Sequence, residues 1–171
     1  MTSAGPGGVR LERFSRPLLD DLVRGSLVRP AHWHPQYRAA DLVAIARMLL
    51  GAYAAMGVTP DETSPWWVFG IMVEGRLVGD AGFHGPPAPD GPVEVEIGYS
   101  VVPALRGRGV ASRACALLLA HAWRHGAEVV RADVEPANPH ASASRQVLGV
   151  NGFRPTARGD FAVAAPVSPP T

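Results

Sequence analysis

The sequence predicts a single α/β (α+β) domain built around one sheet. Residues 93–101 alternate strictly between apolar and polar types, as a half-buried strand does. Residues 41–56 and 112–124 instead carry apolar side chains at helical spacing. The full order of predicted elements is strand, two helices, a three-strand meander, helix, strand, helix and strand. The 171 residues, 47% of them hydrophobic, suit one core.

The first half of the chain contains one expected strand and two expected helices. Residues 9–14 alternate apolar and polar side chains, which indicates a strand. Residues 18–28 and 41–56 have helical spacing, and Asp41 is the expected N-cap of the second helix. Residues 29–37, rich in His, Trp and Pro, are expected to form an ordered loop.

The middle of the chain predicts a meander of three strands. Residues 67–73 and 77–83 are apolar runs joined by Glu74-Gly75-Arg76, a pattern typical of a hairpin. Residues 85–92 are dense in Pro and Gly and indicate a turn before the strand at 93–101.

The last third predicts helix, strand, helix and strand. The helices are expected at 112–124, ending before Gly126, and at 141–150, with a strand at 129–134 between them. Asn151-Gly152-Phe153 is a turn into a final strand. We expect one domain over residues 1–163 and a disordered tail at 164–171, whose prolines cannot continue a ladder.

Composition excludes several classes of protein. The net charge of +1 and the isoelectric point of about 8.0 give no nucleic-acid-binding surface. The longest apolar run, 114–122, is too short to cross a membrane, and the first ten residues lack the apolar centre of a signal peptide, so we expect a cytoplasmic protein. Cys115 is the one cysteine and fits a core position, and no Cys/His cluster has metal-binding spacing. All 16 basic residues are arginine, which excludes a P-loop lysine and Schiff-base chemistry.

The segment 106–111, Arg-Gly-Arg-Gly-Val-Ala, predicts an anion-binding turn between a strand and a helix. Gly107 and Gly109 allow positive φ angles and let a ligand approach the backbone. The first turn of the following helix adds unpaired N–H groups and the positive end of its dipole. Arg106 and Arg108 add cationic contacts.

Residues 96–111, together with 144–153, carry a family resemblance. The first run resembles the acetyl-CoA-binding core of the GNAT N-acetyltransferases, whose signature R/Q-x-x-G-x-G/A lies between a strand and a long helix. The second run resembles the branch that acetylates the N-termini of ribosomal proteins, in which a Ser begins a helix that ends in Gly-Phe. Residues 79–83 fit that branch too, and the resemblance extends over 9–153.

The resemblance implies a mixed, mostly antiparallel sheet that is splayed at its middle strands and flanked by helices, with acetyl-CoA as co-substrate. It places the pantetheine amides on the backbone of Tyr99, Ser100 and Val101. It places the pyrophosphate on the side chains of Arg106 and Arg108 and on the backbone of Gly107, Arg108, Gly109, Val110 and Ala111. It also brings Asn138 to the pantetheine arm, although Asn138 lies about one helical turn farther from Gly152 than usual and Ala141 occupies the position of the family's Asn.

The implied reaction is direct attack of a primary amine on the thioester, which requires a group that accepts the proton of the amine. Glu96 is the first candidate for this base and Glu94 on the same strand face is the second, since two like charges raise the pKa of one of them. Solvent-facing strand positions are the alternative for both. Leu148 stands where many members have an acidic Tyr, so Ser144 is the candidate donor to the thiolate, with an N-cap role as its alternative.

The acceptor stays open between a peptide or protein N-terminus and a small-molecule amine. Residues expected to line its pocket are His32, Trp33, His34, Trp66, Trp67 and His84. A homodimer is compatible with the family, although the sequence carries no interface signal. Two alternatives remain: a non-catalytic acetyl-CoA-binding module, and a dinucleotide-binding protein whose Asp133 or Glu135 binds ribose, which residues 103–106 disfavour because they separate the strand from the glycines.

Overall fold

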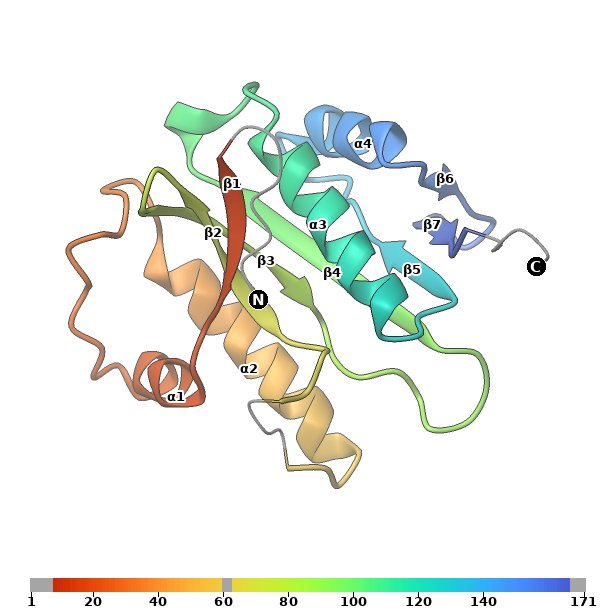
Figure 1. The fold of residues 1–171 in the computed structure, drawn as a ribbon, viewed down its shortest axis with the longest axis horizontal. Coiled ribbons are helices and arrows are strands. Elements are labelled where there is room, and N and C mark those ends of the chain that lie inside the picture. The colour runs from red at the N-terminus through yellow and green to blue at the C-terminus, as the bar shows by residue number, and fades with distance from the viewer. Residues whose placement is uncertain (1–7, 60–62, 167–171) are drawn as a thin grey trace.

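The computed structural model describes residues 8–59 and 63–166. In chain order its elements are β1 (Val9–Arg13), α1 (Arg16–Arg24), α2 (Ala39–Ala55), β2 (Val68–Val73), β3 (Arg76–Phe83), β4 (Glu94–Val101), the 3-10 helix η1 (Pro103–Leu105), α3 (Val110–Arg124), β5 (Val129–Ala132), α4 (Ala141–Val150), β6 (Arg154–Pro155) and β7 (Phe161–Ala164). The strands form one sheet in the order β1-β2-β3-β4-β5-β7-β6 (Figure 1).

The helices cover both faces of the sheet. Alternate side chains of β3 point to opposite faces, as strand geometry requires. Phe83 contacts His121 of α3 on one face, while Asp80 shares a cavity with Ile45 of α2 on the other. No helix within the described part of the chain is long and apolar enough to cross a membrane.

Helix ends differ from the predicted ends where caps decide them. α1 ends at Arg24 rather than at 28, because Gly25 adopts a left-handed φ of 74° and closes the helix. α2 begins at Ala39, so Asp41 lies in its first turn and the N-cap assignment is wrong; Arg38 is the N-cap and makes no side-chain cap bond. α3 begins two residues early, at Val110, directly after Gly109.

The strands lie close to their predicted positions except at the C-terminal end. The predicted final strand is a short hairpin of β6 and β7, and β5 stops at Ala132 instead of 134. Ala164 belongs to β7, and the N–H of Ala165 donates to the carbonyl of Glu128 at 2.8 Å, so a disordered tail starting at 164 is wrong for these residues. Residues 167–171 of that predicted tail lie outside the described residues.

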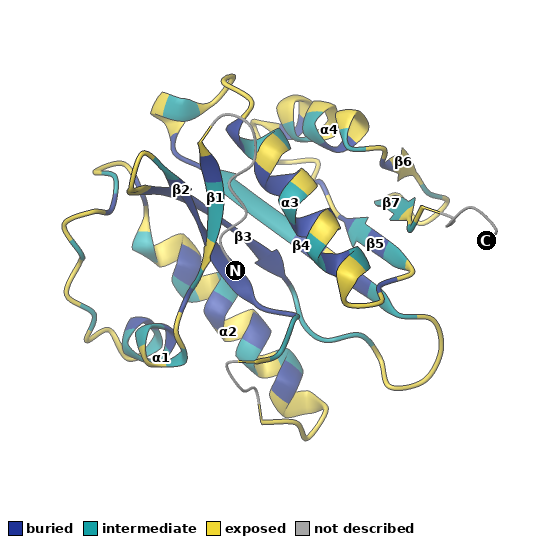
Figure 2. Ribbon diagram, in the orientation of Figure 1, coloured by how far each residue is buried: buried dark blue, intermediate teal, exposed yellow. Residues whose placement is uncertain are grey.

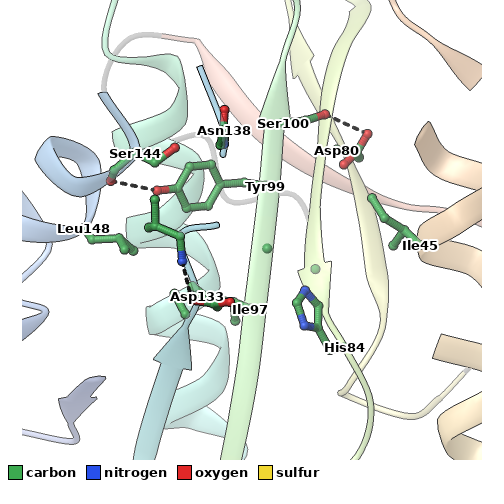
Figure 3. A pocket seen from close by; sticks show the side chains of 14 residues that line it. Ile45, Asp80, His84, Ile97, Tyr99, Ser100, Asp133, Asn138, Ser144 and Leu148 are labelled. Atoms are coloured by element: carbon green, nitrogen blue, oxygen red, sulfur yellow. Dashed lines mark hydrogen bonds between the residues drawn. The ribbon is translucent and has the colours of Figure 1, made fainter. Parts of the chain in front are cut away.

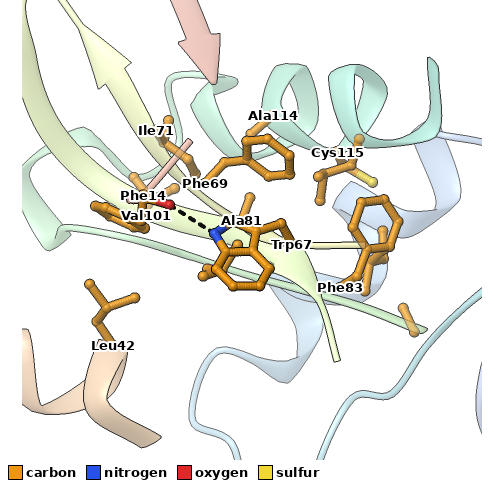
Figure 4. Packing of buried hydrophobic residues seen from close by; sticks show 14 of the residues in the cluster. Phe14, Leu42, Trp67, Phe69, Ile71, Ala81, Phe83, Val101, Ala114 and Cys115 are labelled. Carbon is orange, nitrogen blue, oxygen red and sulfur yellow. Dashed lines mark hydrogen bonds between the residues drawn. The ribbon is translucent and has the colours of Figure 1, made fainter. Parts of the chain in front are cut away.

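The three tryptophans predicted to line the acceptor pocket lie in the hydrophobic core. Trp33, Trp66 and Trp67 are buried, and Trp67 Nε1 donates to the carbonyl of Phe14 at 2.8 Å (Figures 2 and 4). These tryptophans are therefore packing residues. Cys115 is also buried, as expected, and burial raises the pKa of its thiol to about 12.

The sheet is splayed between β4 and β5, as the resemblance implies. β4 pairs with β3 from Ile97 to Val101, but it pairs in parallel with β5 only from Glu94 to Glu96. Beyond Glu96, the edge of β4 that faces β5 therefore has no strand partner.

Gly79 of β3 lies against the backbone of β4, where a Cβ would overlap the carbonyl oxygen of Ser100. Gly79→Ala should lower the free energy of unfolding by about 3 kcal/mol or more, since backbone atoms must move. Gly51→Ala is the matched control: Gly51 lies in α2 with open space around it, and alanine should stabilise the helix by about 0.5–1 kcal/mol. Chemical denaturation of both variants checks this, and equal effects would contradict it.

Candidate active site

A backbone cradle for an anion follows β4. Gly107 and Gly109 have φ angles of 71° and 76°, in the left-handed region that favours glycine. Gly109 is also the N-cap residue of α3, so the unpaired N–H groups of the first turn of that helix follow it directly. The turn thus combines backbone donors with the positive end of a helix dipole.

The two arginines of this turn behave differently. Arg106 Nε donates to the carbonyl of Val101 at 3.0 Å, and its Nη1 lies 2.7 Å from His140 Nε2. Arg108 is exposed and does not line the adjoining groove. The structure therefore brings Arg106 to the cradle and adds His140, which the sequence analysis did not single out.

A groove of about 530 Å³ runs from this cradle along β4. One wall is the free edge of β4 and the other is α4 with the loop before it. Of the residues predicted to bind the co-substrate, all except Arg108 line the groove: Tyr99, Ser100, Val101, Arg106, Gly107, Gly109, Val110, Ala111 and Asn138.

A second cavity of about 280 Å³ lies where β4 and β5 separate (Figure 3). It shares Tyr99, Ser100, Asn138 and Ser144 with the groove. The Tyr99 hydroxyl donates to the carbonyl of Ser144 at 3.2 Å, which links β4 to α4 at this point. The two spaces therefore meet at residues of β4 and α4.

Ser144 lies inside α4, not at its start. The N-cap of α4 is His140, so the alternative N-cap role of Ser144 is wrong. Asn138 is the residue that supports the helix start, because its Oδ1 accepts from the N–H of His140 at 2.8 Å. The Ser144 hydroxyl therefore does not cap α4, and Ser144 lines both the groove and the cavity.

The two candidate base carboxylates are each held by a partner. Glu96 Oε1 lies 3.0 Å from His84 Nδ1, and this hydrogen bond holds the pKa of Glu96 below its usual range, so the predicted rise is wrong for this residue. Glu94 Oε1 accepts from Arg131 Nε at 2.5 Å. Neither carboxylate lines the cavity, whereas His84 does.

His84 covers the middle of β4. Its Nε2 lies 2.8 Å from the position that a Cβ on Gly98 would occupy, so the imidazole uses the space that the missing side chain leaves. Its Nδ1 faces Glu96 and its backbone N–H donates to the carbonyl of Glu96 at 2.9 Å. His84 was among the expected acceptor residues, and the structure places it at the cavity together with a carboxylate partner.

Asp80 is the cavity residue that sequence reasoning missed. It is 0% exposed, and its Oδ2 accepts from Tyr37 Oη at 2.9 Å and from Ser100 Oγ at 3.0 Å. Within the described residues its Oδ1 has no hydrogen-bond partner, and burial raises the pKa of this carboxyl to about 6. The available signal was a lone acidic residue in the apolar run 77–83.

Solved acetyltransferase structures share this fold. Mycobacterium smegmatis RimJ, in complex with CoA-disulfide, is 22% identical with a TM-score of 0.61 over 96% of this chain and 86% of that chain. A ribosomal-protein-S5-alanine acetyltransferase from Vibrio fischeri is 15% identical, with a TM-score of 0.59 over 99% of this chain and 100% of that one. The Salmonella typhimurium protein yncA, solved with acetyl-CoA, is 18% identical, with a TM-score of 0.57 over 94% and 96%. No curated protein sequence matches.

A family model gives the more specific finding. The model described as "Acetyltransferase (GNAT) domain" matches residues 16–154, which include the cradle, the groove and the cavity. The dinucleotide-binding alternative therefore does not hold. The chain belongs to the GNAT acetyltransferase family.

Proposed function

We propose that this protein transfers the acetyl group of acetyl-CoA to a primary amine. The observation that carries the proposal is the free edge of β4, which runs from an anion cradle at one end to a cavity at the other, and that cavity is lined by His84, the hydrogen-bond partner of Glu96. Family membership supports acetyl-CoA as the donor.

The groove fits an elongated, anionic donor. The N–H groups after Gly109 and the guanidinium of Arg106 suit the pyrophosphate. The backbone groups of Tyr99 and the N–H of Val101, which face away from β3, suit the amides of a pantetheine arm, because an edge strand pairs with an extended amide chain. The backbone of Ser100 faces β3 instead. Val147 and Val150 provide apolar surface opposite. When bound, acetyl-CoA supplies the thioester.

His84 is the catalytic base of the proposal and Glu96 its positioning residue. An aliphatic ammonium has a pKa of about 10.4 and must lose a proton before its nitrogen attacks. Glu96, whose lowered pKa keeps it ionised at neutral pH, accepts from Nδ1–H of His84 and so leaves Nε2 as the proton acceptor. The ammonium first gives one proton to Nε2. The free amine nitrogen then bonds to the thioester carbon, the C–S bond breaks, and the second proton of the nitrogen reaches the departing thiolate through the Ser144 hydroxyl.

Ser144 is the proposed proton donor to the departing thiolate. Its hydroxyl lies between groove and cavity, one helical turn before Leu148, where the acidic Tyr of many members is missing. A thiolate with an ordinary pKa near ~8.5 is a moderate base, so a hydroxyl or a water suffices. Glu94 has no role in this scheme, because Arg131 engages it away from the cavity.

The acceptor class follows from two unlike indications. Two proteins of the same fold, RimJ and the ribosomal-protein-S5-alanine acetyltransferase, favour a peptide N-terminus as acceptor. The cavity of about 280 Å³ favours a small amine instead. Purified protein should be incubated with acetyl-CoA and a panel of peptides and small amines, with thiol release and product mass as readouts. Acetyl-CoA binding without acetylation of any amine would favour the non-catalytic module.

Gly109→Asp should abolish acetyl-CoA binding while the protein stays folded. A Cβ at this position meets only the guanidinium of Arg113, at 3.7 Å, so there is room for it, but the carboxylate places a negative charge in the cradle. Gly57→Asp is the matched control, since Gly57 also has a positive φ of 65° and open space, away from the groove. Calorimetric titration with acetyl-CoA measures both, and unchanged affinity in Gly109→Asp would remove the cradle assignment.

Glu96→Gln and His84→Gln should each lower kcat at pH 7 by roughly 10²-fold, the usual scale of a lost general base, with little change in the KM for acetyl-CoA. The loss should shrink toward pH 10, where free amine is abundant. Because the two residues act as one unit, the double variant should be no slower than His84→Gln alone. Full turnover of Glu96→Gln at pH 7 would contradict the pairing.

Ser144→Ala should slow acetyl transfer without lowering the melting temperature, since Ser144 caps no helix. Ser142→Ala, an exposed position of the same helix outside both cavities, is the matched control and should leave turnover unchanged. Turnover and melting are measured on the same preparations. Normal turnover in Ser144→Ala would assign protonation of the thiolate to solvent.

A further inference from the structure

A buried carboxylate that the proposed reaction does not use lies in the wall of the cavity. Asp80 is 0% exposed, and only its Oδ2 is hydrogen-bonded among the described residues. Leaving the second oxygen of a buried carboxylate unpaired is costly. A packing role would be served better by an apolar residue, so this carboxylate points to a ligand.

Ser100 connects this charge to the cavity. The Ser100 hydroxyl donates its hydrogen to Asp80 Oδ2 at 3.0 Å, so its oxygen lone pairs are left as acceptors. Ser100 is half-buried and lines the cavity (Figure 3). A cation that donates to Ser100 Oγ therefore has the Asp80 charge directly behind its acceptor.

The charges around the cavity favour cations. Its ionisable lining residues are Asp80, Asp133, His84 and Tyr99, and no arginine lines it. Two carboxylates without a cationic partner in the lining produce a negative potential there. An ammonium-bearing acceptor is therefore attracted to this face of the sheet.

Asp80 and His84 mark two separate positions. Asp80 lies in β3 and His84 directly follows β3 on the same face, four residues on, or about 13 Å between Cα atoms at ~3.3 Å per residue. Gly82 lies between Asp80 and His84 on the same face without a side chain, and the imidazole of His84 extends over Gly98, back toward Asp80. A carboxylate stabilises the charged form of an amine, whereas the amine that reacts at His84 must lose its proton. The cation held near Asp80 is therefore not the reacting nitrogen.

We infer that Ser100 and Asp80 form a subsite for a second ammonium group, which makes a small diamine the preferred acceptor. The inference rests on the proposed function. One nitrogen is acetylated beside His84 while the other stays charged beside Ser100. The small volume of the cavity matches a flexible diamine chain lying over Gly82, beside the ring of His84.

The test compares linear terminal diamines, from diaminopropane to diaminohexane, with monoamines of the same chain length. In the wild-type protein, kcat/KM for the best diamine should exceed that of its monoamine by roughly 10-fold or more, the scale of one hydrogen bond to a charged group. Asp80→Asn should bring this ratio close to one. Asp90→Asn, which removes an exposed carboxylate outside the cavity, should retain it.

Equal kcat/KM for diamines and monoamines in the wild type would overturn the inference, and so would an unchanged ratio in Asp80→Asn. In either case, acetylation of monoamines would still support the proposed function. If Asp80→Asn does not fold, Ser100→Ala must lower the same ratio. If no amine is acetylated, calorimetric binding of diamine but not monoamine by the wild type still supports the subsite, and its absence refutes it. A preference confined to peptides with Lys, rather than Ala, after the N-terminal residue would also refute the small diamine.

Discussion

The separation of β4 from β5 after Glu96 is the constraint on which the rest of the site depends. The backbone C=O of Ile97 and the N–H and C=O groups of Tyr99 and Val101 face this edge and have no strand partner there, and such groups require another partner when they are shielded from water. Arg131 fixes the point of separation, since it donates both to Glu94 on β4 and to Asp160 beside β7. These ion pairs are partly exposed, so their contribution is positional more than energetic.

The sequence predicts the scaffold better than the side-chain partnerships. Strand alternation and the glycines at 107 and 109 suffice for the sheet and the cradle, because both depend on local geometry. The Glu96–His84 pair depends on the register of β3 against β4, and the missing side chain of Gly98 is what makes room for the ring. Periodicity carries no information about such cross-strand pairs. The ends of α1 were missed for a related reason, since they are set by caps. Ser15 is its N-cap and accepts from the N–H of Leu18, and Gly25 closes the helix.

The groove and the cavity on either side of β4 are lined by side chains of opposite charge. On the groove side the charged lining is cationic, with Arg106 hydrogen-bonded to His140. On the cavity side the lining carries Asp80 and Asp133. In the proposed reaction, the polyanionic donor and the cationic acceptor are each attracted to a different side of β4, and each is disfavoured at the place of the other. Tyr99 and Ser144 line both spaces, and in the proposed reaction the reacting atoms of the two substrates meet beside them.

The buried carboxyl of Asp80 lowers the stability of the fold at neutral pH. Burial raises the pKa of its carboxyl from 3.8 to about 6, against the hydrogen bonds from Tyr37 and Ser100 that lower it. Between these values the folded chain holds a proton that the unfolded chain has released, so the contribution of this group to stability falls as the pH rises and is fully lost above pH 6. At neutral pH the fold thus retains a buried charge that opposes its own stability. A cation placed beside Ser100 stabilises the buried charge of Asp80. Binding of such a cation therefore restores part of the folding stability that this charge costs.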